Sequence, residues 1–137
     1  MWSGDSPFQV VLWVPLTNSV STNAMFLLKP SLSLEAYSRS RSGELKSMKD
    51  IHAQYSNAFE PIEVKFGEVL LFDSNCLHGN QLNTTKSTRW SLNCRFTSLL
   101  APAISPERRL GPYYTPLVVR PATQMGLRAI QALGLLD

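Results

Sequence analysis

The hydrophobic positions of this chain fall into short runs separated by turns, which predicts a fold made mainly of β-strands. Residues 8–16, FQVVLWVPL, form a nearly continuous apolar run rich in β-branched and aromatic side chains, as in a buried strand that ends at Pro15. After the turn TNSVST, residues 23–30, NAMFLLKP, predict a second strand. Apolar and charged residues then alternate from Ile62 to Phe66, which indicates a strand with one exposed face.

Further strands are predicted in the second half of the chain. The turn Gly67-Glu68 leads into VLLFD, residues 69–73, for which we expect a fully buried strand. The loop NTTKST then precedes the longest predicted strand, from Arg89 to Leu100. Alternation places Arg89, Ser91, Asn93 and Arg95 on one face of it, and Trp90, Leu92, Cys94 and Phe96 on the other. We expect the apolar face to be buried, whereas the polar face suits either water or the inside of a barrel that binds an anion.

Two segments depart from this strand pattern. Residues 31–50 are rich in Ser, Lys and Arg and show little periodicity, which predicts a surface loop that acts as a mobile lid. Near the end of the chain, spaced apolar residues predict a helix over residues 123–133, with Thr123 as N-cap and Gly134 as the stop. Short strands with one terminal helix are typical of a mainly β domain, either a sandwich or a barrel.

Length and composition favour one globular domain. The chain has 137 residues, 44% of them hydrophobic and 17% charged, which suits a single domain with a strand core over residues 1–100 and an extension over 101–137. It has no apolar run long enough for a membrane span and no signal-like start, so we expect a cytoplasmic protein. Cys76 and Cys94 are interpreted as reduced thiols, with Cys94 a small buried apolar residue.

The charge distribution argues against a nucleic-acid partner. The net charge is +3, and the basic residues are scattered rather than gathered with aromatic residues into a stripe. We therefore expect a small-molecule partner, and the sequence leaves a homo-oligomer open.

The candidate chemistry lies around His78. This histidine follows a buried strand and the short turn SNC, and a hairpin pairs it with the strand that carries Arg89 and Ser91. The planar fork of an arginine matches a carboxylate, and a neighbouring hydroxyl adds a second hydrogen bond. One hypothesis is therefore a carboxylate-bearing cosubstrate that is held by Arg89 and Ser91 and reaches a metal on His78. The other is a structural histidine with a solvated arginine.

These residues carry a resemblance to a known family. FGEVLLFDSNCLHGN, residues 66–80, with STRWSLNCRF, residues 87–96, resembles the second half of the double-stranded β-helix of Fe(II)/2-oxoglutarate-dependent dioxygenases. The likeness is strongest to the phytanoyl-CoA dioxygenase-like group and to oxygenases of carbohydrate-biosynthesis gene clusters. Residues 8–30 are similar to the paired strands of that family, and the resemblance spans roughly residues 2–100. Its matching positions are Gly67-Glu68, Phe72, His78-Gly79, Arg89, Ser91 and the turn Asn23-Ala24.

The resemblance implies a fold, two cofactors and a reaction. The fold is a double-stranded β-helix, or jelly roll, incomplete at its N-terminal side. His78 would bind Fe(II), and Arg89 with Ser91 would bind the distal carboxylate of 2-oxoglutarate. Asn23 and Gln9 either line that pocket or complete hydrogen bonds at strand ends. Oxidative decarboxylation of 2-oxoglutarate would then drive hydroxylation of a small-molecule or sugar-related substrate.

The chain also departs from the family pattern. The family binds iron through two histidines and one carboxylate, and its His-x-Asp or His-x-Glu pair should lie just before the strand that begins at Phe8. No histidine stands there, and Asp5 before Ser6-Pro7 suits a turn. His52 comes after the two strands that it should precede. We therefore expect that the chain begins inside the domain, that the first two ligands lie upstream of Met1, and that this chain alone is inactive.

Two other functions fit part of the pattern. A non-catalytic jelly-roll module would use the Arg89 face to bind an acidic or carbohydrate ligand without metal. A cupin-like metal isomerase is the second alternative, but it normally needs several histidines, and this chain has two.

Overall fold

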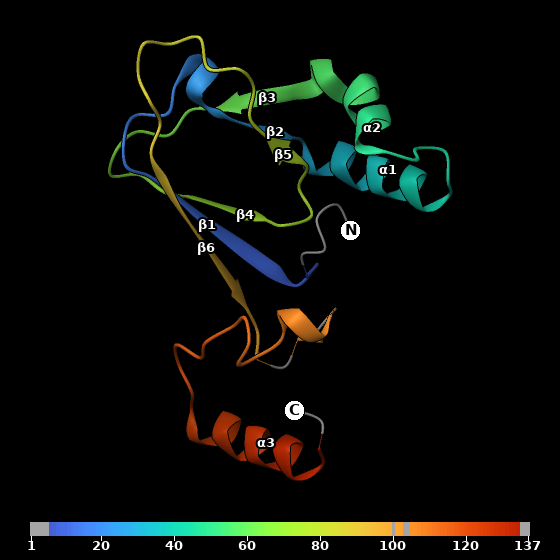
Figure 1. Ribbon diagram of the computed structural model, residues 1–137, viewed down its shortest axis with the longest axis vertical. Coiled ribbons are helices and arrows are strands. Elements are labelled where there is room, and N and C mark those ends of the chain that lie inside the picture. The colour runs from blue at the N-terminus through green and yellow to red at the C-terminus, as the bar shows by residue number, and fades with distance from the viewer. Residues whose placement is uncertain (1–5, 100, 103–104, 135–137) are drawn as a thin grey trace. The chain divides into compact units, whose positions relative to one another are not determined.

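The computed structural model describes residues 6–99, 101–102 and 105–134. The chain divides into two compact units, Met1–Phe96 and Thr97–Asp137, and each is described by itself. Figure 1 shows the elements in chain order. The described strands are β1 (Gln9–Pro15), β2 (Met25–Leu28), β3 (Phe59–Ile62), β4 (Leu70–Asp73), β5 (His78–Gly79) and β6 (Ser91–Thr97). The described α-helices are α1 (Pro30–Arg41), α2 (Met48–Tyr55) and α3 (Pro121–Ala132).

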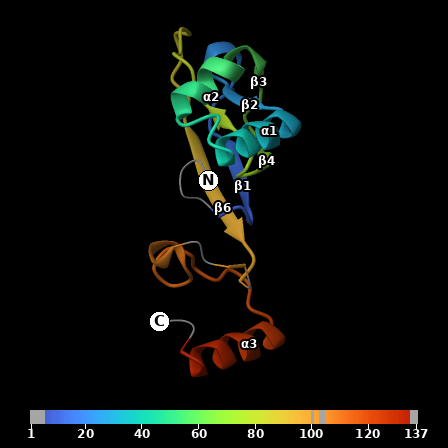
Figure 2. The ribbon, with the colours of Figure 1, turned by 90° about the vertical axis from the view of Figure 1, so that its right-hand side faces the viewer.

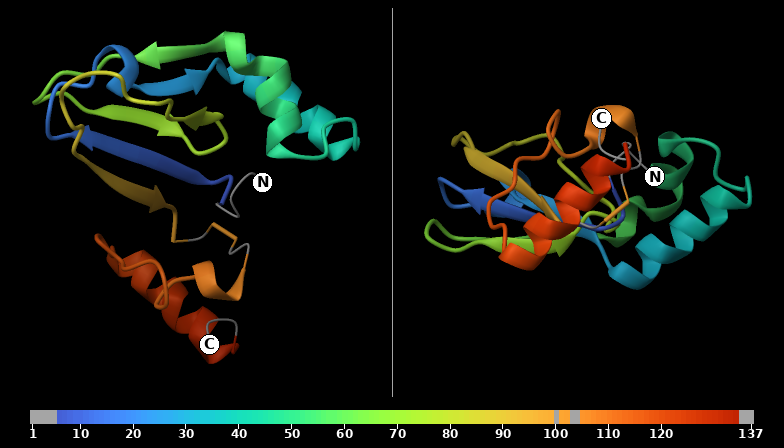
Figure 3. Two further views of the ribbon diagram at one scale, coloured as in Figure 1. Left: turned by 45° about the horizontal axis from the view of Figure 1, so that its top comes forward. Right: turned by 90° about the horizontal axis from the view of Figure 1, so that it is seen from below.

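The strands form two three-stranded sheets, in the orders β4-β1-β6 and β3-β2-β5. β4 runs antiparallel to β1, with Val11 opposite Phe72, and both β3 and β5 run antiparallel to β2. One apolar cluster joins the two sheets, because it combines Val11, Trp13 and Phe72 of the first with Met25 of the second. The first unit is therefore a partial β-sandwich, which can be followed in the left view of Figure 3.

β1 has the burial pattern that its sequence predicts. Gln9, Val11, Trp13 and Pro15 are buried, and the residues between them are exposed or half-buried. This alternation places every second side chain toward the cluster between the sheets. The strand ends at Pro15, as predicted.

The predicted lid over residues 31–50 is wrong, because this segment holds helix α1 and the start of α2. α1 begins with Pro30 at its first turn, where the missing N–H of proline costs no helical hydrogen bond. α2 begins at a capping box, in which Ser47 Oγ accepts from Asp50 N and the Asp50 carboxylate accepts from Ser47 N. A serine, Ser33, occupies a buried position of α1, and a leucine, Leu34, is exposed, so the apolar period of the helix is weak in the sequence.

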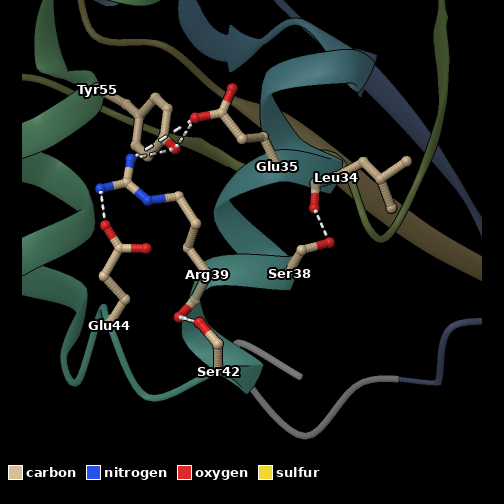
Figure 4. Close-up of polar contacts among 7 residues, drawn as sticks. All are labelled: Leu34, Glu35, Ser38, Arg39, Ser42, Glu44 and Tyr55. Carbon is tan, nitrogen blue, oxygen red and sulfur yellow. Dashed lines mark hydrogen bonds and ion pairs between the residues drawn. The ribbon is translucent and has the colours of Figure 1, made fainter.

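A buried tyrosine ties α1 to α2. Tyr55 of α2 donates from its hydroxyl to Glu35 of α1 (2.7 Å) and accepts from Arg39 of α1 (3.0 Å), as Figure 4 shows. Arg39 also pairs with Glu44 in the loop that joins the helices (2.6 Å). We call Glu35, Arg39, Glu44 and Tyr55 the helix clasp. The clasp holds α1 and α2 beside one another (Figure 2).

Three strand predictions need correction. The strand predicted over residues 62–66 ends at Ile62, and Val64 makes only an isolated bridge to Ser19. The strand predicted as fully buried, β4, buries Phe72 but exposes Leu71, because one face of its sheet points away from the cluster. The strand predicted from Arg89 to Leu100 is β6, Ser91–Thr97, and residue 100 lies outside the described residues.

The apolar face of β6 is also exposed, against prediction. Trp90 is 65% exposed and Leu92 55%, and Cys94 is exposed rather than buried. Ser91 and Asn93 on the polar face are exposed as well, so neither face of β6 is buried over residues 91–94. Arg89, which precedes the strand, lies over the ring of Trp13.

In the second unit, the predicted terminal helix is present as α3. It begins at Pro121, two residues earlier than predicted, with Arg120 rather than Thr123 as N-cap, because proline is well suited to the first helical turn. Gly134 has a φ of +66°, the left-handed conformation that ends a helix, and its N–H donates to Gln131 O. Among the described residues, no helix has the length and apolarity needed to span a membrane.

Candidate functional site

His78 begins strand β5, opposite Leu27 of β2. Its Nδ1 lies 2.8 Å from the carbonyl oxygen of Cys76, and its ring meets the edge of Phe72 with 4.9 Å between the centroids. The tautomer with its proton on Nδ1 donates to that carbonyl and leaves a lone pair on Nε2 of this exposed residue. This is the arrangement in which a histidine binds a metal.

Arg89 lies two residues before the start of β6 and is half-buried. Its Nη1 donates to the backbone oxygen of Asn23 (2.8 Å), and its Nη2 donates to Oδ1 of Asn80 (2.7 Å). The guanidinium carbon lies 5.3 Å from the ring centroid of Trp13. Burial lowers the pKa of Arg89, although an arginine stays charged. The two bonds use two of the five N–H donors, which leaves donors for a carboxylate.

Asn23 is buried at the end of a short 3-10 turn, Ser21–Asn23. Its Oδ1 accepts from Val20 N (2.7 Å), and its Nδ2 donates to Ser87 Oγ (3.3 Å). Asn23 thus contacts Arg89 through its backbone, while its side chain joins the turn to the loop before β6. A role of the Asn23 side chain toward a cosubstrate stays a prediction.

Ser91 is the first residue of β6 and is exposed. It lies two residues after Arg89, on the same alternation face of this segment. Its predicted hydrogen bond to a carboxylate also stays a prediction.

The structure brings His78 and Arg89 to the same apolar cluster, but not through the predicted hairpin, because β5 pairs with β2 whereas β6 belongs to the other sheet. His78 contacts Phe72 and Arg89 contacts Trp13, and both rings belong to the cluster between the sheets. Asn80 connects the two, because it follows His78 by two residues and accepts from Arg89. Sequence reasoning missed Asn80. Its carboxamide in the segment His-Gly-Asn was the signal that could have found it.

The described residues do not form an iron triad. Among them, no three His, Cys, Asp or Glu side chains lie close enough together to hold a metal ion. His52 is exposed on α2, and Asp5 lies outside the described residues. His78 is therefore the single candidate ligand that the described residues offer on the evidence of both sequence and geometry.

Comparison with known proteins assigns the class. Residues 1–91 match the family described as phytanoyl-CoA dioxygenase (PhyH). Because the match covers well over half of the chain, the protein belongs to the PhyH family, a family of dioxygenase-like enzymes. This confirms the resemblance seen around His78 and Arg89.

One curated relative is the streptomycin biosynthesis protein StrG of Streptomyces griseus. It is 27% identical to this chain over 93 residues, which is 67% of this chain and 32% of the relative. The chain thus spans about a third of the length of that relative. No solved structure matches the chain significantly.

Proposed function

We propose that this chain is part of a non-haem Fe(II)- and 2-oxoglutarate-dependent oxygenase with a jelly-roll fold, acting on a small molecule. Family membership supports the reaction class. The observation that carries the proposal is the placement of His78 and Arg89 on one cluster, with Asn80 between them. A ligand for iron and an anchor for a dicarboxylate need this kind of proximity, because 2-oxoglutarate binds the metal at one end and the anchor at the other.

Each residue has a separate role in this proposal. The remaining N–H donors of Arg89 bind the distal carboxylate of 2-oxoglutarate, and Ser91 adds a hydrogen bond. Asn80 and the backbone of Asn23 hold the guanidinium in place for that contact. His78 supplies one ligand to Fe(II).

Near Phe72 and Trp13, the described residues supply the imidazole of His78 rather than a triad of ligands. A single neutral imidazole binds Fe(II) weakly against water, and we propose that the 137-residue chain by itself does not turn over 2-oxoglutarate. The Streptomyces griseus relative is named as a protein of streptomycin biosynthesis, which agrees with a small-molecule substrate.

Calorimetric titration with 2-oxoglutarate tests the proposal on the chain as it exists. We expect the wild-type chain to bind 2-oxoglutarate, Arg89→Ala to bind it much more weakly, and His78→Ala to lose the added affinity that Mn(II), a redox-inert stand-in, provides. Succinate formation by the wild-type chain should be absent. Equal binding by the wild type and Arg89→Ala would contradict the cosubstrate role. Metal-independent binding of an acidic sugar in place of 2-oxoglutarate would instead support a non-catalytic binding module.

A further inference from the structure

A cavity of about 770 Å³ lies next to His78, within the first unit. It is bounded by β2 and β3 of one sheet, by β4 of the other and by α1. Its volume falls in the range of small-molecule sites in proteins. Neither His78 nor Arg89 is among the lining residues, and so the cavity is separate from the anchor just described.

The cavity touches the proposed metal ligand through two wall residues. Phe72 forms part of the wall and meets the ring of His78 at its edge. Cys76 forms another part, and its carbonyl oxygen lies 2.8 Å from His78 Nδ1. A molecule in the cavity would therefore be separated from His78 by the side chain of Phe72. Arg89 contacts the cluster at a different ring, Trp13, which does not line the cavity.

Much of the cavity wall is apolar. Side chains of both sheets and of α1 contribute to it, and its aliphatic and aromatic members include Leu27, Leu28, Leu34, Ile62, Leu70 and Phe72. Such a wall favours the apolar part of a ligand, because burial there removes apolar surface of both partners from water.

Several polar groups of the wall already have partners. Ser33 Oγ donates to Leu28 O (3.2 Å) and accepts from Leu77 N (3.0 Å). Asp73 Oδ1 accepts from both the backbone and the side-chain nitrogen of Asn75, each at 2.7 Å.

At the exposed rim, Lys29 and Glu60 pair with each other (3.0 Å). A charged ligand would have to break these bonds or lose its hydration without replacement, which is unfavourable. The wall thus selects against charge as well as for apolar surface.

We propose that this cavity binds the apolar body of an uncharged small-molecule substrate and holds it beside His78. The word substrate rests on the proposed function, whereas the binding of an uncharged apolar molecule does not. Arg89 and the cavity would then bind different ligands, because neither Arg89 nor Trp13 lines the cavity.

Titration with two uncharged probes, 1-octanol and myo-inositol, tests the cavity in the full chain. Leu34→Lys is the main variant, because Leu34 lines the cavity and is 66% exposed, so a lysine there is tolerated by the fold. Leu34→Trp fills the same position without charge. Leu82→Lys is the matched control, since Leu82 is 82% exposed and does not line the cavity.

We expect saturable binding of 1-octanol and no binding of myo-inositol. Leu34→Lys should weaken 1-octanol binding at least about tenfold, because a charge at the cavity opposes burial of an aliphatic chain. Leu34→Trp should also weaken it, and Leu82→Lys should change it less than about twofold. Tighter binding of myo-inositol, no binding of either probe, or 1-octanol binding that neither Leu34 variant affects would overturn the proposal.

The two proposals fail in different ways. If 1-octanol binds in the cavity and 2-oxoglutarate does not bind, the cavity stands as a binding site and the oxygenase proposal fails. If 2-oxoglutarate binds through Arg89 and 1-octanol does not bind, the cavity proposal alone fails.

Discussion

Asn80 Oδ1 accepts a hydrogen bond of 2.7 Å from Nη2 of Arg89. Asn80 lies two residues after His78, on the segment that leaves β5, and Arg89 lies just before β6. One carboxamide thus holds the guanidinium at a set position relative to the strand that carries the imidazole. We interpret Asn80 as a positioning residue for Arg89.

Replacing Asn80 by alanine should weaken 2-oxoglutarate binding, although the positive charge of Arg89 is kept. A hydrogen bond between a charged donor and a neutral acceptor contributes about 1.5–3 kcal/mol at most. We expect the affinity for 2-oxoglutarate to fall by about five- to tenfold, because the carbonyl oxygen of Asn23 still accepts from Nη1 of Arg89. Asn83→Ala is the control in the same loop, since Asn83 bonds within the loop, to Ser87 O (2.8 Å). Calorimetry with 2-oxoglutarate distinguishes the two, and equal losses would contradict the positioning role.

Replacing Arg89 by alanine should lower the affinity for 2-oxoglutarate by about ten- to a hundredfold, because a charge-assisted contact of about 1.5–3 kcal/mol is removed. Binding of Mn(II) should change little, since His78 is not altered. Arg89→Lys keeps the positive charge but loses the planar guanidinium, so its affinity for 2-oxoglutarate should lie between those of the wild type and Arg89→Ala. A parallel loss of metal and 2-oxoglutarate binding in Arg89→Ala would instead indicate a structural role.

The two cysteines should react with a thiol reagent at very different rates. Cys94 is exposed on β6, whereas Cys76 is partly buried in the first unit. Burial, and secondarily the charge of Asp73, raises the pKa of the Cys76 thiol, so that its reactive thiolate is scarcer at neutral pH. Labelling at pH 7.5 should therefore show one fast and one slow thiol. Cys94→Ser should remove the fast phase, and loss of the slow phase instead would contradict the described burial.

Because of Tyr55 in the helix clasp, the free energy of unfolding should fall as the pH rises into the alkaline range (Figure 4). Burial, and then the hydrogen bond to Glu35, raises the pKa of Tyr55 above its ordinary value of 10.0. The folded chain thus favours the neutral phenol, so this contribution to the free energy of unfolding is complete below about pH 10 and is lost as the pH rises further.

Tyr55→Phe tests the clasp by chemical denaturation at pH 8 and above pH 10. At pH 8 we expect the variant to be less stable by about 0.5–1.5 kcal/mol, because the hydroxyl bonds to Glu35 and Arg39 are gone. Above pH 10 the difference from wild type should narrow, because only the wild type then has a buried phenol to ionise. Tyr37→Phe on α1 is the control, and a difference that does not change with pH would refute the linkage.

Local sequence patterns were enough for part of the site and of the fold. The run over residues 8–16 determined β1 and its end at Pro15, because β-branched residues favour a strand and proline cannot continue the ladder. The apolar spacing near the C-terminus predicted α3, and Gly134 predicted its stop. The segments around His78 and Arg89 carried the family resemblance, because those motifs are short and local in sequence.

Tertiary structure decided which faces are buried. Sequence alternation divides the side chains of β6 between two faces, but it does not determine which face is buried. In the structure, Trp90 and Leu92 are exposed. The contact of Arg89 with the ring of Trp13, more than seventy positions away in the chain, is likewise a tertiary one. The same holds for α1, whose helical character depends on burying Ala36 against other elements rather than on its own weak periodicity.

The sequence by itself therefore determined the family, β1, α3 and the candidate residues His78 and Arg89. Only the tertiary structure placed Asn80 on Arg89 and set the apolar cavity beside His78. The physical reason is the range of the interactions. Propensities, caps and alternation act over a few residues along the chain, whereas the bond between Asn80 and Arg89 and the cavity wall need side chains that meet only after the sheets have packed.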